Sequence, residues 1–125
     1  MVHNVLCGDL NIMTIKNNNY RKVINTTAYQ QLVLMSLKPK EEIGMEVHKK
    51  IDQFIHIEKG TALAIIGKED NQKKYKLKKK HFITIPAGNY HNIINIGTSE
   101  LKLYSIYSPS HHKPGTIQKV KPEND

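Results

Sequence analysis

Short runs of β-branched and aromatic residues recur along the chain, and clusters of Gly, Pro, Asn and Lys separate them. Apolar residues spaced as on one face of a helix are hard to find. Such punctuated runs are typical of strands rather than helices. We therefore predict an all-β fold of about ten short strands. The predicted strands cover residues 13–15, 20–25, 31–37, 43–48, 53–58, 62–67, 73–77, 82–85, 91–95 and 101–107.

The turns between these runs favour antiparallel hairpins. The sequence Glu58-Lys59-Gly60 ends one run, and residues 67–71 are polar apart from an opening glycine. Many short strands at this spacing predict a sandwich, jelly roll or barrel. A chain of 125 residues is the usual size of one domain. We expect a single domain over 1–125, with a core at about 20–108, N-terminal strands within 1–19 and a surface tail at 109–125.

Nothing in the sequence predicts a membrane protein or an exported one. The chain has no apolar run of the length that a membrane span needs, and its first residues lack a charged start followed by a long apolar stretch. The lone Cys7 cannot form an internal disulfide and has no neighbours that would activate a thiolate. We therefore expect a cytoplasmic protein.

The formal charge of +8 raises nucleic acid as a partner. Arg21 is the only arginine, so the chain lacks the planar guanidinium forks that give bidentate contacts to phosphate and guanine. The lysine-rich run 73–80 alternates around Tyr75 and Leu77, as an exposed hairpin strand does. These observations argue against nucleic acid as the partner.

Two side chains with metal-binding atoms stand two residues apart in the predicted strand 43–48. Alternation along a strand places Glu46 and His48 on the same face. The polar segment 49–52 is short enough to reverse the chain, and Gln53 then opens the next strand beside His48. Three candidate ligands therefore converge.

A fourth candidate, His91, begins a strand after the turn that Pro86 and Gly88 favour. The donor set would be one carboxylate oxygen, one amide oxygen and two imidazole nitrogens. This set suits a borderline divalent ion such as Zn, Ni, Fe, Mn or Cu. A buried Glu46 also needs a cation nearby to offset its desolvation.

At this point the sequence resembles a known family. IGMEVHKKIDQFIHIEKG and IPAGNYHNIIN are similar to the first and second motifs of the cupin superfamily, and their order is the same. The strand QLVLMSLKP and the ending YSIYSPSHHKPGTI resemble those of small stand-alone cupins, so the resemblance extends over residues 20–117. It implies a double-stranded β-helix, or jelly-roll barrel, with the ion inside it, and often a homodimer.

The chain departs from the usual motifs at several positions. Glu46 and Gln53 stand where the superfamily commonly has His and Glu, so the ligand types are a variant arrangement. Lys40 and Lys80 stand where glycine is common in turns, and Lys49 stands where the subgroup often has proline. These changes affect the expected turn geometry but leave four residues able to bind metal.

The resemblance implies a metal-dependent enzyme acting on a small molecule, with dioxygenation, isomerisation or hydrolysis as the reaction. The alternative is a small-molecule binding or sensor module without catalysis. No general base stands out, and only Tyr90, Tyr104 and His111 are candidates for contact with a substrate.

The remaining polar side chains have simpler interpretations. His56 and Glu58 alternate with Ile55 and Ile57, so we expect them on the outward face and exclude them as ligands. We interpret the pair at 111–112 as surface histidines of the tail, although they could approach the barrel mouth or another subunit.

Overall fold

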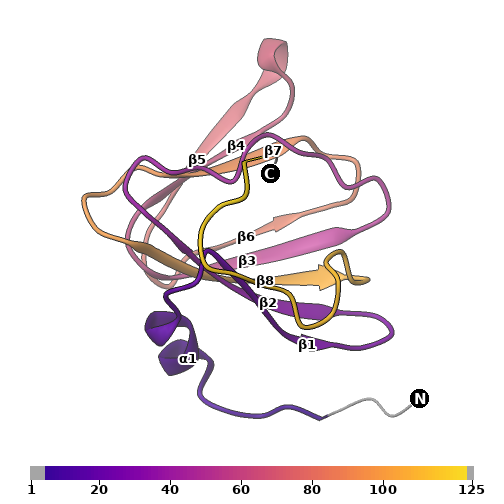
Figure 1. Cartoon of the computed structure of the whole chain (residues 1–125). Helices are drawn as coiled ribbons and strands as arrows, with labels where there is room; N and C mark the ends of the chain where they lie inside the picture. The colour runs from indigo at the N-terminus through magenta and orange to yellow at the C-terminus, as the bar shows by residue number, and fades with distance from the viewer. Residues whose placement is uncertain (1–4, 124–125) are drawn as a thin grey trace.

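The computed structural model describes residues 5–123 and contains two antiparallel β-sheets that face each other (Figure 1). The larger sheet has the order β6-β3-β8-β2-β1-β9 and the smaller has the order β5-β4-β7. The strands are β1 Arg21–Thr26, β2 Gln31–Leu37, β3 Asp52–Lys59, β4 Ala62–Ile66, β5 Lys73–Leu77, β6 Phe82–Ile85, β7 His91–Asn95, β8 Leu101–Ser108 and β9 Ile117–Gln118. The predicted all-β jelly-roll fold is confirmed.

The core lies between the two sheets because one face of each strand is apolar. In β3, Ile55 and Ile57 are fully buried, whereas Phe54 and His56, which alternate with them, are only half-buried. Ala64 of the smaller sheet is also fully buried. Burying a side chain of the size of isoleucine contributes about 1.5 to 3 kcal/mol, so this alternation selects the register of the strands.

The predicted strand at 13–15 is wrong. Residues Leu10–Lys16 form the helix α1, and Asp9 caps it by accepting a hydrogen bond from the Ile12 amide at 3.0 Å. Its Thr14 is fully buried, and the helix packs against β3 and β8 on the outer face of the larger sheet (Figure 1). A short 3-10 helix, η1 Glu69–Asn71, lies in the turn between β4 and β5.

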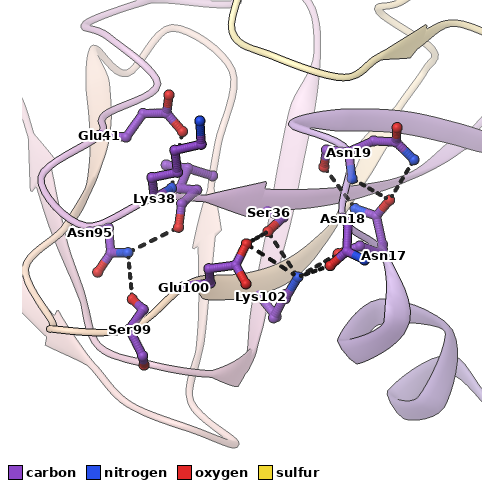
Figure 2. Close-up of polar contacts among 11 residues, drawn as sticks. Asn17, Asn18, Asn19, Ser36, Lys38, Glu41, Asn95, Ser99, Glu100 and Lys102 are labelled. Atoms are coloured by element: carbon purple, nitrogen blue, oxygen red, sulfur yellow. Dashed lines mark hydrogen bonds and ion pairs between the residues drawn. The ribbon is translucent and has the colours of Figure 1, made fainter.

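A buried lysine joins the end of α1 to the sheet. The ammonium of Lys102, on β8, donates hydrogen bonds to the Asn17 carbonyl at 2.6 Å, to Ser36 Oγ at 2.9 Å and to Asn18 Oδ1 at 3.1 Å. Figure 2 shows this ammonium between the helix end and the Glu100 carboxylate, which is 3.8 Å away. Burial lowers the pKa of Lys102, and Glu100 offsets part of this effect.

The predicted strand at 43–48 is also wrong. Residues 42–48 make only isolated bridges with β7, between Glu42 and Ile94 and between Glu46 and His91. Gly44 has a φ of 104°, which interrupts any regular strand. Ile43 of this segment is buried in the core, whereas Met45 is 45% exposed.

Two turns keep a backbone conformation that glycine normally supplies. Lys40 and Lys80 have φ values of 71° and 76°, in the left-handed region. The positions at which the resemblance led us to expect glycine therefore keep their turn geometry with lysine in place.

The tail is more ordered against the barrel than we expected. After β8 the chain turns back, and β9 pairs with β1 through Lys22 and Ile117 and through Arg21 and Gln118. In the described part of the chain, no helix is long and apolar enough to cross a membrane.

Candidate metal centre

The position of Glu46 follows from its pairing with β7. Glu46 and His91 exchange two backbone hydrogen bonds of 2.9 Å, one in each direction. Side chains directly opposite each other in an antiparallel pair lie on the same face. The Glu46 carboxylate and the His91 imidazole therefore meet inside the barrel, with 3.4 Å between Oε1 and Nε2.

His48 completes a three-residue cluster. Its Nε2 lies 3.3 Å from Glu46 Oε1, and its ring centroid lies 5.3 Å from that of His91. One donor atom from each of the three residues lies within 4.8 Å of the others, which is the spacing of groups that share a metal ion. Both histidines are buried, while about a third of the Glu46 side chain is exposed.

The unpaired atoms of the interior fit a metal. His48 Nε2, His91 Nε2 and Gln53 Oε1 are buried, and none of them makes a hydrogen bond; the contacts of the two nitrogens with Glu46 have the distance of ion pairs but not hydrogen-bond geometry. Buried polar atoms normally have a partner. All three are atoms that ligate divalent ions, so the residues present fit the cofactor that the sequence predicts.

Neighbouring polar groups orient two of these side chains. The Asn89 carbonyl lies 3.0 Å from His91 Nδ1, and because a carbonyl can only accept, Nδ1 carries the proton and Nε2 keeps its lone pair. The Gln53 amide donates from Nε2 to Ser105 Oγ at 2.9 Å, which leaves Oε1 as the free end of the amide. These contacts preorganise the donor atoms before any ion binds.

The electrostatics of the cluster favour a charged carboxylate. Burial of Glu46 raises the pKa of its carboxyl, but the close contacts and charge interactions with His48 and His91 outweigh burial and hold that pKa well below its usual range. The Glu46 carboxylate is therefore negatively charged at neutral pH.

Gln53 is buried inside the barrel, and Tyr107 lies between it and the three-residue cluster in the order of contacts. Gln53 pairs with Tyr107 across β3 and β8, and the Tyr107 ring lies 5.9 Å from the His48 ring. Three of the four predicted ligands thus form one cluster, and the fourth, Gln53, is buried on the inward face of β3.

The three weak candidates for substrate contact separate in space. His111 lies at the cluster, with its ring centroid 4.3 Å from that of His48. Tyr104 lies on the outer face of the sheet, where its ring stacks on His56 at 5.2 Å. The Tyr90 ring faces the Lys68 ammonium at 5.0 Å. Only His111 is therefore placed at the site.

The exclusion of His56 and Glu58 as ligands agrees with their position on the outer face. Glu58 is nonetheless buried there, because His56 Nδ1 lies 2.7 Å from its carboxylate and Asn11 of α1 donates to it. Two hollows of ≈ 250 and ≈ 410 Å³ lie along β6, and the three clustered residues line neither of them.

Sequence reasoning missed two residues that shape the site, Gln31 and Tyr107. Gln31 is a fully buried polar residue that opens the otherwise apolar strand β2, and Tyr107 is an inward residue of β8. An inward polar position in an apolar strand was the available signal for Gln31.

Comparison with known proteins agrees with the fold. A family model described as "Cupin domain" matches residues 33–107, so the chain belongs to the cupin family. Within that family it is 53% identical over 112 residues to the uncharacterised protein L612 of Acanthamoeba polyphaga mimivirus, over 89% of this chain and 69% of that protein. It is 39% identical over 115 residues to the uncharacterised protein YrkC of Bacillus subtilis strain 168, over 90% of this chain and 62% of that protein. The crystal structure of BH2720 from Bacillus halodurans matches with a TM-score of 0.92 at 36% identity, over 94% of this chain and 91% of that one.

Proposed function

We propose that this cupin holds one divalent metal ion through Glu46, His48, Gln53 and His91 and uses it to act on a small molecule. The observation that carries the proposal is the convergence of two unpaired, buried imidazole nitrogens on one anionic carboxylate. The buried and unpaired oxygen of Gln53 supports its role as the fourth ligand.

The donor set indicates what the centre would do. Two imidazoles, an amide and a single carboxylate suit Zn, Ni, Fe, Mn or Cu and leave one unit of positive charge on the complex. A bound ion would act there as a Lewis acid toward an oxygen of the substrate. Dioxygenation and isomerisation are the reactions that fit a centre of this kind in a small barrel.

The chain's own residues would prepare that chemistry. Asn89 fixes the His91 ring, and Ser105 fixes the Gln53 amide, so the ligands need little rearrangement. Ile55 and Ile57 supply a dry wall beside them, because both are fully buried on the inward face of β3. A dry wall strengthens charge interactions at the centre.

The first test is the metal content of the natively purified protein beside two ligand variants. We expect nearly one equivalent of metal in the wild type and loss of that metal in His48→Ala and His91→Ala. His81→Ala is the matched control, because His81 is exposed and its Nδ1 accepts only from the Lys78 amide at 3.0 Å. No bound metal in the wild type after reconstitution would refute the proposal.

The metal-loaded protein then distinguishes an enzyme from a binding module. Turnover of a small molecule that is lost in both ligand variants supports the enzyme. Retention of a small molecule without turnover, detected by native mass spectrometry, would support the sensor alternative instead. Iron or copper in the native protein would direct the search toward oxygen chemistry, and zinc toward Lewis-acid chemistry.

A further inference from the structure

The segment that follows β8 is fixed to the barrel by one buried amide. Gln31 is fully buried, and its Oε1 accepts hydrogen bonds from the backbone amides of His111 at 3.1 Å and His112 at 2.9 Å. Its Nε2 donates to the His112 carbonyl at 2.7 Å and to Thr26 Oγ1 at 2.9 Å. These four contacts use both ends of the amide, so Gln31 sets the backbone position of the two histidines.

The fixed backbone places one imidazole against a proposed metal ligand. The His111 ring lies 4.3 Å from the His48 ring and 5.6 Å from the Tyr107 ring. The His112 ring instead meets the edge of Tyr107 at 5.2 Å, and its Nε2 lies 3.4 Å from the Tyr107 hydroxyl. The two neighbouring histidines therefore have different environments.

The two histidines in this contact differ in their exposure to solvent. His48 is only 8% exposed, whereas His111 is exposed to solvent. The His111 ring, which lies 4.3 Å from that of His48, therefore covers part of this buried ring from a solvent-exposed position. A small molecule entering on this side has to fit beside that ring or displace it, and the hydrogen bonds to Gln31 oppose displacement.

We propose that His111 is a specificity-determining residue that restricts the open side of the metal centre to small ligands, and that Gln31 is the residue that positions it. The inference rests on the proposed metal function and adds the size class of the ligand. The imidazole acts through its volume: a ligand of a few atoms fits beside it, and a ligand that carries an aromatic ring does not.

The test uses two carboxylates of different size and the cobalt-substituted protein. Formate and benzoate present the same carboxylate, and their binding to Co²⁺ is followed by the change in its visible absorption spectrum. In the wild type we expect formate to bind at least about tenfold more tightly than benzoate, the scale on which pockets discriminate by shape. In His111→Ala we expect benzoate affinity to rise about tenfold and formate affinity to change less than about twofold.

Three further variants separate volume from other effects. His111→Phe keeps a ring without its nitrogens, so it should keep the preference for formate. Gln31→Leu should behave as His111→Ala does, because it releases the backbone that carries the ring. Lys113→Ala, at an exposed position of the same segment, should leave both affinities unchanged.

The outcomes distinguish the inference from the proposal beneath it. Protein that takes up no cobalt refutes the metal centre and this inference together. Protein that binds cobalt but has the same ratio of formate to benzoate affinity in wild type and His111→Ala refutes the inference alone. Loss of cobalt in His111→Ala would make His111 a ligand rather than a wall, and loss of the preference in His111→Phe would assign the effect to a ring nitrogen; either result overturns the inference.

Discussion

The amide of Gln53 is the sharpest test of the proposed fourth ligand, because its removal should have different effects on the stability of the metal-free and the metal-loaded protein. In the metal-free protein, Gln53 Oε1 is a buried acceptor without a partner, which costs about 1 to 3 kcal/mol. Gln53→Met removes this acceptor at similar volume and also removes the hydrogen bond to Ser105, worth about 1 kcal/mol. We therefore expect the metal-free variant to be between equal to the wild type and about 2 kcal/mol more stable.

Metal should stabilise the wild type more than Gln53→Met. At a free metal concentration one hundred times its Kd, binding raises the free energy of unfolding of the wild type by about 2.7 kcal/mol. Loss of even an outer-shell partner weakens metal binding by about 10- to 100-fold. At the same metal concentration, the gain in Gln53→Met would then fall to about 1.4 or 0.4 kcal/mol.

Urea unfolding with added zinc and with a chelator measures both quantities on each protein. The difference between the two conditions is the metal-dependent stabilisation, which does not depend on the packing of the substituted side chain. His81→Ala, outside the site, should gain as much from zinc as the wild type does. Equal gains in the wild type and Gln53→Met would refute the assignment of Gln53 as a ligand.

Two further predictions concern the scaffold. Burial lowers the pKa of Lys102 in the folded protein, so the unfolded chain binds more protons than the folded one as the pH approaches about 10.4. The free energy of unfolding of the wild type should therefore rise with pH relative to that of Lys102→Met. Urea unfolding between about pH 8 and 10 checks this, and a difference that does not change with pH would contradict it. Lys40→Gly and Lys80→Gly should each raise the free energy of unfolding by about 0.5 to 1 kcal/mol, because a side chain at a φ of 71° or 76° is strained. Lys79 precedes Lys80 and has no positive φ, so Lys79→Gly should be slightly destabilising. The same change in the free energy of unfolding at all three positions would show that the strain is absent.

The strands that could be predicted with both ends correct are short apolar or aromatic runs bounded by turn residues. The predicted ranges 31–37, 73–77, 82–85 and 91–95 agree with β2, β5, β6 and β7 at both ends. The turn residues on either side indicate where such a run begins and ends, even where burial does not alternate along it, as in β2 and β5. The helix α1 was not predicted because Ile12, Thr14 and Ile15 have high β propensity and obscured the stronger local signal, which was the capping Asp9.

The contact between His111 and His48 could not be predicted from local pattern. It depends on Gln31, which lies 80 residues before His111 and holds the backbone of the tail through its side chain. An amide that opens an apolar strand marks an inward polar position, but only the folded chain shows which segment it binds. Residues that act through such long-range hydrogen bonds have no spacing by which a sequence pattern could find them.

The proposed metal ligands show that residues can be predicted to lie together for an incomplete reason. We placed Glu46 and His48 together by alternation along a strand, yet segment 43–48 is not a strand. Glu46 faces the centre because its backbone pairs with His91, and this pairing joins the two sequence motifs directly. The positions of the ligands therefore depend on one bridge between the motifs. A change that breaks this bridge should disperse the donor atoms while leaving every ligand side chain in place.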